Sequence, residues 1–415
     1  MRPGHWYRIS GDGPDLGLVP TALGTRYLAD NDPARDPRLN PPWSAKERLR
    51  RLLGREWRSP WRGRVGFRAI TEAWNSAVFA SRCGPCGSMV VFGGGHADYY
   101  GADVHAFDLA SRTWARISDG WLGGTPSQYG EGARYPAAHY PNGSPLPPHT
   151  YDYVQYDPVT NDYLLAKGQV ELGDHVEAIA IPHLFNLTQR RWRHGPHHPH
   201  AVLNSGGCSA WDAARRVLWV HSGDDGGGNT FIGFIPDGEN RDGSFGRWTT
   251  LHDSKLRGTA NHNAMQHVPT LDLLVIACHA RDALGAVAPG RPDAPLSWLA
   301  SCGERPRLAE YAALQFAPRS GALVYCAPRD GGAVYAIEPP DSLLSCAKAA
   351  RWSWRRVDAP DRTLDPFEDA AQSSRGAVNR SHLFGRLRIA TFDDGDYAVL
   401  VRHVDSPVYA MRLPG

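Results

Sequence analysis

Short apolar runs separated by turns recur along this chain. Six segments share one pattern, in which a short strand, a turn of Asp, Pro, Gly or Asn and a second, apolar strand follow one another. They begin at Trp74, His149, Asn204, Asn261, Ala309 and Arg386. A third strand follows most copies, as in "VHAFDL" and "HLFNL", and a tryptophan usually marks a fourth. Four short strands in a unit of this size are the signature of a β-propeller blade.

The two ends of the chain fit a closed ring. Residues 408–413, "VYAMRL", read as a third strand with no fourth strand after it. Residues 5–10, "HWYRIS", match the fourth-strand pattern "TWARIS" of residues 113–118. We therefore expect the N-terminal strand to complete the last blade and protect its edge. The pattern predicts an all-β chain with a single propeller over residues 1–415, of six blades. A degraded seventh would have to lie in residues 11–65 or 358–379.

Residues 11–65 do not follow the blade pattern. Within this irregular insertion, "SAKERLRRLLGREW" (44–57) has a serine with a glutamate three residues later, then a basic amphipathic run. This combination predicts a short helix with a capped N-terminus.

Composition and charge exclude several classes of partner. The 14 Trp, 44 Gly and 33 Pro suit many short strands joined by turns. With 45 Lys and Arg against 43 Asp and Glu, the net charge of +2 predicts neither nucleic-acid nor membrane binding. No run reaches the roughly 18 apolar residues of a membrane helix. The first residues lack the apolar core of a signal peptide, so a cytoplasmic protein and a secreted one with its signal removed both stay open. We expect a monomer.

The cysteine and histidine motifs predict no obligatory cofactor. "CGPC" (83–86) falls in a hairpin turn rather than at a helix N-terminus, which favours a structural disulfide or two idle thiols over redox chemistry. "HGPHHPH" (194–200) suggests metal ligands, but its prolines prevent helical spacing and it lies between blades. Because histidines are common metal ligands, a structural metal ion nevertheless stays an alternative.

Polar residues recur where the first strand of each unit begins. In a propeller blade this place shares a face with the loop between the second and third strands. We count from one position in the turn between the first and second strands of each unit, namely Gly84, Asp157, Asp212, Val268, Ala317 and Asp393. Six residues before these turn positions lie Val78, Tyr151, Gly206, His262, Tyr311 and Leu387. Twelve residues after it lie His96, Gln169, Asp224, Ala280, Arg329 and Asp405. His149, Asn204 and His382 lie just before first strands. Any one of these side chains could simply join two blades by a hydrogen bond, and only their convergence favours a site.

The first unit carries a family resemblance. The pattern "VVFGGG…VHAFDL…TW" resembles the kelch repeat, including the kelch-like domain of galactose oxidase. The string "GGGHADYYGADVHAFDL" (93–109) is similar to bacterial propeller polysaccharide lyases such as the ulvan lyases. This resemblance implies a lyase that cleaves a uronate-containing polysaccharide by β-elimination, with His and Tyr transferring protons and Arg or Lys neutralising the carboxylate.

The resemblance and the strand positions together give a set of candidate residues. His96 matches the lyase-like string, and His149 and Tyr151 are the acid–base pair expected from their positions. The expected substrate-binding residues are Tyr100, Lys167, Asn204, His262, Arg281, Tyr311, Arg329 and His382. The expected partner is an acidic polysaccharide or oligosaccharide, with no metal required.

Other functions remain open on the sequence. A non-catalytic kelch propeller would bind a glycan or a protein through the same face. A glycoside hydrolase needs two carboxylates, for which Asp224 and Glu310 are the rim candidates. Copper oxidation would use Tyr311 and His382, but it lacks a cysteine on that face.

Overall fold

The computed structural model describes twenty segments of the chain. They are residues 1–10, 19–20, 26–27, 70–71, 73–94, 102–118, 139–140, 143–166, 168–172, 175–179, 181–198, 206–221, 231–252, 262–291, 296–328, 331–340, 351–359, 364–368, 382–403 and 406–415. In these segments no helix is long and apolar enough to span a bilayer. The helix expected over 44–57 lies outside them.

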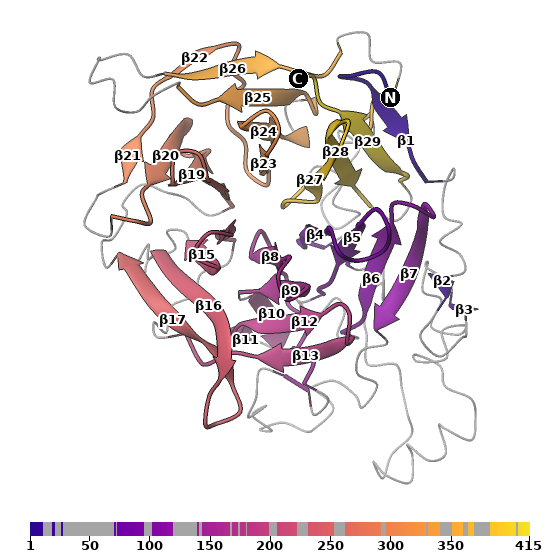
Figure 1. Cartoon of the computed structure of the whole chain (residues 1–415), viewed down its shortest axis with the longest axis vertical. Helices are drawn as coiled ribbons and strands as arrows, with labels where there is room; N and C mark the ends of the chain where they lie inside the picture. The colour runs from indigo at the N-terminus through magenta and orange to yellow at the C-terminus, as the bar shows by residue number, and fades with distance from the viewer. Residues whose placement is uncertain are drawn as a thin grey trace.

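Six antiparallel sheets stand around a common axis (Figure 1). Blade one is β4 (Ala77–Ala80), β5 (Ser88–Val91), β6 (Val104–Asp108) and β7 (Thr113–Ser118). Blade two is β8 (Val154–Asp157), β9 (Asp162–Leu165), β12 (His183–Asn186) and β13 (Arg191–His194). Blade three is β14 (Cys208–Asp212), β15 (Val217–His221), β16 (Phe231–Glu239) and β17 (Phe245–His252). Blade four is β18 (Ala264–Val268), β19 (Leu273–Cys278), β20 (Ala283–Val287) and β21 (Ser297–Trp298). Blade five is β23 (Ala313–Ala317), β24 (Ala322–Cys326), β25 (Val334–Glu338) and β26 (Trp352–Arg356), and blade six is β27 (Leu387–Phe392), β28 (Gly395–Val401), β29 (Val408–Arg412) and β1 (Trp6–Arg8).

The ring is closed with six blades. Each innermost strand lies against the next, from β4 through β8, β14, β18, β23 and β27 and back to β4. A seventh blade is thereby excluded. The N-terminal strand joins the last blade as expected, with Trp6 opposite Met411 and Arg8 opposite Tyr409. Figure 1 shows the two chain ends at the same corner of the molecule.

The apolar core lies between neighbouring blades. Six clusters of buried residues occupy the six interfaces of the described part, and the cluster between blades one and six includes Val91, Phe107, Ala390 and Val399. The middle strands are buried on both faces, as in the wholly buried run of β24. Burying a Val or Leu side chain completely contributes about 1.5–3 kcal/mol to the stability of the fold. Because both faces of these strands are buried, the second strands read as continuous apolar runs rather than alternating ones.

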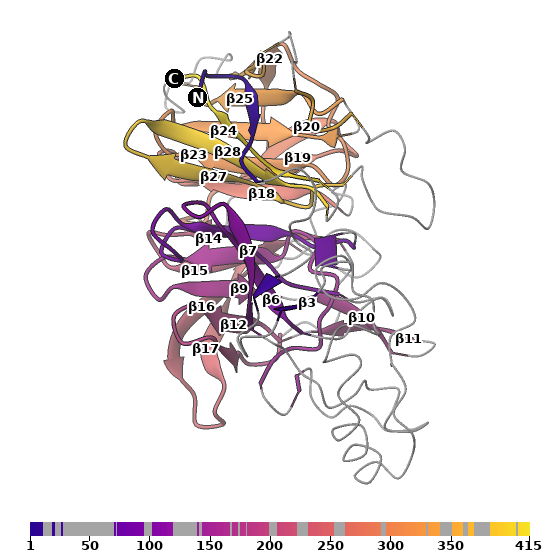
Figure 2. The same ribbon diagram turned by 90° about the vertical axis from the view of Figure 1, so that its right-hand side faces the viewer.

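Several additions decorate the blades. The hairpin of β10 (Gly168–Leu172) and β11 (His175–Ile179) is inserted in blade two and projects from one face of the ring (Figure 2). Strand β22 (Ser301–Gly303) runs parallel to β26 and covers the outer edge of blade five. A small ribbon of β2 (Val19–Pro20) and β3 (Arg26–Tyr27) lies beside β7. The outer strand of blade four, β21, has only two residues.

The "CGPC" motif forms the turn between β4 and β5, as the sequence predicts. Cys83 and Cys86 are both free thiols in this structure. Burial raises the pKa of Cys83, which disfavours the reactive thiolate. The turn lies on the face opposite the one at which the innermost strands begin.

Candidate functional site

In each blade, one residue near the axis lies two or three positions before the start of the innermost strand. We call this set the collar, and the face on which it lies the top face. The collar consists of Trp74, Tyr151, Gly206, His262, Tyr311 and Phe384. Backbone hydrogen bonds join several members across blades. The amide of Tyr151 donates to the carbonyl of Trp74 at 2.9 Å, and that of Tyr311 donates to the carbonyl of His262 at 3.2 Å.

The collar backbone is strained. Four bulky members have φ in the left-handed region, at 44° for Tyr151, 61° for His262, 62° for Tyr311 and 45° for Phe384, whereas Gly206 adopts a φ of 77° without strain. Bulky residues rarely adopt this conformation, and each instance costs on the order of 1–3 kcal/mol. Residues held this way concentrate at binding and catalytic sites. The same strain at equivalent positions of successive blades therefore marks the collar as a candidate site.

The side chains of the collar meet over the axis. The ring of Tyr151 lies 5.6 Å from that of His262 and 5.8 Å from that of Phe384, between centroids, although these residues belong to blades two, four and six. His149 packs edge-on to Trp74 at 5.1 Å. The side chains of His149 and Tyr151 are only 3% and 1% exposed. These two candidates thus form the floor of the site.

A second layer of rings is partly exposed. The ring of Tyr311 lies 3.8 Å from that of His382 and 4.5 Å from that of His262, between centroids. All three side chains are of intermediate exposure, as is Trp74. The structure therefore presents a tyrosine ring in contact with two imidazole rings on the top face.

The structure brings together five of the candidates, namely His149, Tyr151, His262, Tyr311 and His382. The candidates His96, Tyr100, Lys167, Asn204 and Arg329 lie outside the described residues. Arg281 is exposed and lies over the ring of Trp298, 5.6 Å from its centroid, toward the outer strand of blade four. The catalytic and binding roles of all these residues stay predictions.

Counting from the turns misplaced two collar positions. Val78 and Leu387, expected at the start of the first strands, are buried within β4 and β27. Trp74 and Phe384 occupy these positions instead. The reason is local geometry, because the turn after β4 spans residues 81–87 and β27 is longer than β8.

Two further groups flank the collar: the imidazole of His279, which the count did not select, and Glu310, the rim acid considered from the sequence for a hydrolase. His279 follows β19, and its Nε2 lies 3.4 Å from Oε1 of Glu310, while its Nδ1 lies 3.2 Å from Oδ1 of Asn263. Asn263 and Glu310 are the chain neighbours of His262 and Tyr311. The count pointed to Ala280, one residue away from His279.

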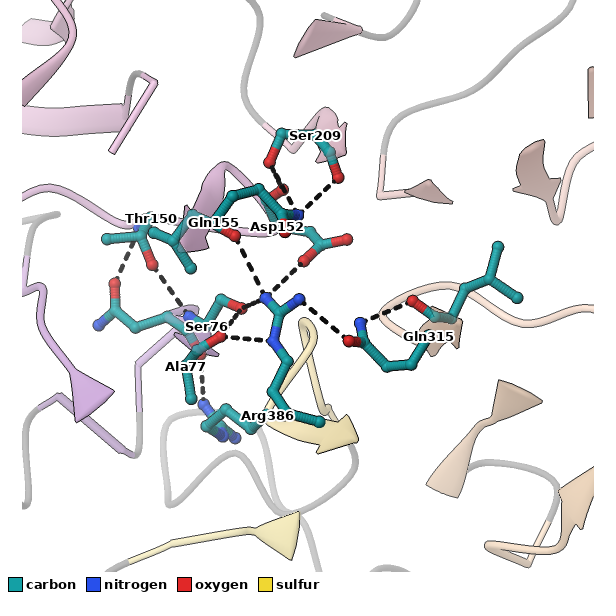
Figure 3. Close-up of polar contacts among 12 residues, drawn as sticks. Ser76, Ala77, Thr150, Asp152, Gln155, Ser209, Gln315 and Arg386 are labelled. Atoms are coloured by element: carbon teal, nitrogen blue, oxygen red, sulfur yellow. Dashed lines mark hydrogen bonds and ion pairs between the residues drawn. The ribbon is translucent and has the colours of Figure 1, made fainter. Parts of the chain in front are cut away.

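A buried polar network plugs the axis beneath the collar. Asp152, Gln155, Ser209, Ser76 and Gln315 gather from four blades, as Figure 3 shows. The Arg388 guanidinium lies at their centre, with Nε donating to the carbonyl of Ala77 at 2.6 Å and Nη2 lying 3.4 Å from Oδ1 of Asp152. Burial raises the pKa of the Asp152 carboxyl to about 7, although Arg388 opposes the shift. We call this network around Arg388 the plug; its hydrogen bonds join the blades directly beneath the collar.

A second buried arginine holds the site where blades six and one meet. Arg386 donates through Nη1 to the carbonyl of Asn75 at 2.8 Å and through Nη2 to that of His382 at 2.9 Å. Burial lowers the pKa of Arg386 to about 9. The contact with His382 ties the exposed layer of rings to blade one.

Gly206 leaves room for His262, and this predicts a specific effect of substitution. A Cβ on Gly206 would lie 2.1 Å from Nδ1 of His262. We expect Gly206→Ala to displace the His262 ring and to destabilise the protein by more than the roughly 1–2 kcal/mol of left-handed backbone strain alone. Thermal unfolding measures the loss.

Gly321→Ala is the matched control for that substitution. Gly321 has a φ of 69°, and a Cβ there would meet nothing within 4 Å. Equal losses of stability in the two variants would contradict a specific clash with His262.

A polar cluster on the opposite face has a different character. Asp212, His267 and Asp272 gather closely enough to suggest metal ligands. Arg215, however, donates to Asp212 at 2.8 Å and to both carboxylate oxygens of Asp272 at 2.6 Å. These contacts lower the pKa of Asp272. The arginine supplies the positive charge here, so the cluster is an ion-pair network between blades three and four.

Comparisons with known proteins add little beyond the fold. No protein-family model matches the chain, and no curated protein matches it. Among solved structures the chain is similar to a nidogen/laminin complex, with 10% identity, a TM-score of 0.37 and coverage of 63% of this chain and 74% of that chain. No kelch or lyase family is identified by them. What the sheets and their closed order establish is a six-bladed β-propeller.

Proposed function

We propose that this propeller is a carbohydrate-active enzyme that cleaves a uronate-containing polysaccharide by β-elimination at the collar. The observation that carries the proposal is the contact of Tyr311 with His262 and His382 in a partly exposed layer over the axis. Aromatic rings of this kind also offer flat surfaces on which sugar rings stack. The layer therefore combines a surface for a glycan with groups able to exchange protons.

The chemistry needs three contributions from the protein. A base removes the proton from the carbon α to the uronate carboxylate, the C–O bond at the β carbon breaks, and the electron pair forms a C=C bond. The departing oxygen takes up a proton from an acid. A cation or hydrogen-bond donor neutralises the carboxylate and so makes the α proton acidic.

The residues suit these parts as follows. Tyr311 and His382 form the exposed acid–base pair that a substrate on the top face reaches first. His149 and Tyr151, the pair expected from the sequence, support it from the floor, and His96 stays a candidate from the resemblance. The neutralising cation in this proposal is Lys167 or Arg329, because Arg281 lies toward the outer strand of blade four.

Product formation tests this proposal directly. The protein is incubated with a panel of uronate-containing polysaccharides while the ultraviolet absorbance of the unsaturated uronate product is followed. We expect an increase with the wild-type protein. Tyr311→Phe keeps the ring but removes the hydroxyl, so we expect kcat/KM to fall by about 10²–10⁴-fold.

Tyr397→Phe provides the control, because Tyr397 lies near the β27–β28 turn on the opposite face and its hydroxyl bonds to Asp394. Full activity of Tyr311→Phe would contradict the assignment. No product with any substrate, together with glycan binding that Tyr311→Ala weakens, would instead favour a non-catalytic binding module at the same collar.

A further inference from the structure

Three histidines outside the collar gather on the outer part of blade two. His183 begins β12 and His194 ends β13, and the two are directly paired across the strands. His139 belongs to none of the four strands of this blade. Its ring stacks on that of His194 with centroids 4.5 Å apart and lies 6.1 Å from that of His183. Three imidazoles from three separate segments thus share one place on the top face.

The hydrogen bonds around this cluster leave ring nitrogens available as metal ligands. His183 is completely buried, and its Nδ1 lies 3.0 Å from the carbonyl oxygen of Ile181. Because a carbonyl only accepts, Nδ1 carries the proton and Nε2 carries the lone pair. A backbone carbonyl that fixes the tautomer in this way is a common feature of ligating histidines. His194 has a weaker version of the same contact, with Nδ1 lying 3.4 Å from the carbonyl of Gly195.

Two of these nitrogens have no hydrogen-bond partner among the described residues. They are Nε2 of His183 and Nδ1 of His139, and both are buried. Leaving a buried polar atom unpaired is unfavourable, because the atom has given up its hydrogen bonds to water. A hydrogen-bonding explanation of the cluster therefore leaves its two inner nitrogens unexplained, whereas a ligand in their midst would satisfy both.

We propose that His139, His183 and His194 form a binding site for a divalent transition metal, with Zn²⁺ as the best fit. Three imidazole ligands plus one water make the usual tetrahedral coordination of zinc with an open position. The stacked rings of His139 and His194 point their lone pairs in parallel planes, so binding requires one of them to rotate about its Cβ–Cγ bond. The backbone of His139 lies outside the blade sheets and forms an isolated β-bridge with Pro145.

The site uses part of the "HGPHHPH" tract that the collar does not. His194 is its first residue, whereas His198 turns away and packs edge-on to Trp248, with centroids 4.6 Å apart. The ligands are thus selected by the fold rather than by spacing within the tract. The site is also independent of the proposed lyase chemistry, because no collar residue belongs to it.

Calorimetric titration with Zn²⁺ tests the proposal on the full chain, without an affinity tag and after treatment with a chelator. We expect one equivalent of Zn²⁺ to bind. His139→Ala and His194→Ala should each weaken binding by roughly tenfold or more. Substitution of Co²⁺ should add visible absorption bands typical of a low-coordinate nitrogen site. His198→Ala is the matched control and should bind as the wild type does.

Two results would overturn the proposal. One is the absence of Zn²⁺ binding by the wild-type protein. The other is unchanged affinity in the double variant His139→Ala, His194→Ala, which would locate the ion elsewhere. Thermal unfolding without metal confirms that each variant is folded, and His183→Gln serves as a further variant that keeps a polar side chain at the buried position.

Discussion

Arg388→Met should destabilise this protein by about 3–5 kcal/mol, the usual cost of breaking a buried ion pair from one side. The guanidinium of Arg388 joins blade six to three others through Ala77, Val154, Asp152 and Gln315. Removing it leaves several carbonyl and amide oxygens without donors and leaves the Asp152 carboxyl buried without its countercharge. Unfolding in urea, followed by tryptophan fluorescence, measures the loss.

Two further variants make the expectation specific. Arg82 also bridges two blades, donating to the carbonyls of Pro158 and Val159 at 2.8 Å, but it is exposed. Arg82→Met should therefore cost no more than about 1 kcal/mol. In the double variant Arg388→Met, Asp152→Asn, part of the stability should return because no buried charge remains. Equal losses in Arg388→Met and Arg82→Met would refute the central role of the plug.

The wild-type protein should lose stability more steeply than His149→Gln as the pH falls below about 6.5. Burial lowers the pKa of His149 from 6.5 to about 3. The unfolded chain therefore binds a proton at His149 in this window, whereas the folded protein does not. A depressed folded pKa gives stability that is present above the unfolded pKa and is lost as the pH falls toward the folded one. The expected difference in slope is about 1.4 kcal/mol per pH unit.

Comparing the two proteins isolates this effect from Asp152. The pKa of Asp152 is raised to about 7, so its contribution has the opposite sign and falls as the pH rises from about 4 to about 7. Because Asp152 is present in both proteins, its contribution cancels in the difference. Unfolding free energies at several pH values provide the measurement. His197→Gln, at an exposed position, should follow the wild type, and parallel profiles for His149→Gln and wild type would contradict the prediction.

The blades were predictable because their signals are local. Each innermost hairpin has its own turn and apolar second strand, and the match of residues 5–10 to a fourth strand was enough to predict that β1 completes blade six. Blade four is the least regular of the six, since Trp298 of its outer strand is 40% exposed where the other outer tryptophans are buried or partly buried.

The site was predictable only where strand lengths repeat. Tyr151, His262 and Tyr311 were found by counting because their strands are of similar length, and Phe384 was missed because β27 is longer. The burial of His149 depends on Trp74, which comes from another blade, so no local pattern reveals it. The same holds for Arg388, because "RLRIATF" reads as an ordinary strand until six blades surround the axis. The histidine cluster depends on a loop residue, His139, whose approach to blade two has no periodic signal.

The pairing of β1 with β29 joins two strands that lie far apart in the chain. Trp6 pairs with Met411, so during synthesis β1 cannot complete blade six until β29 has also been made. Five blades consist of strands that are near one another in the chain, whereas blade six stays a three-stranded sheet until the two ends meet. Loop closure over such a separation is slow, although its cost grows only by about 0.6 kcal/mol for each doubling of length. We therefore expect the β1–β29 pair to form after the strands of the other five blades have paired.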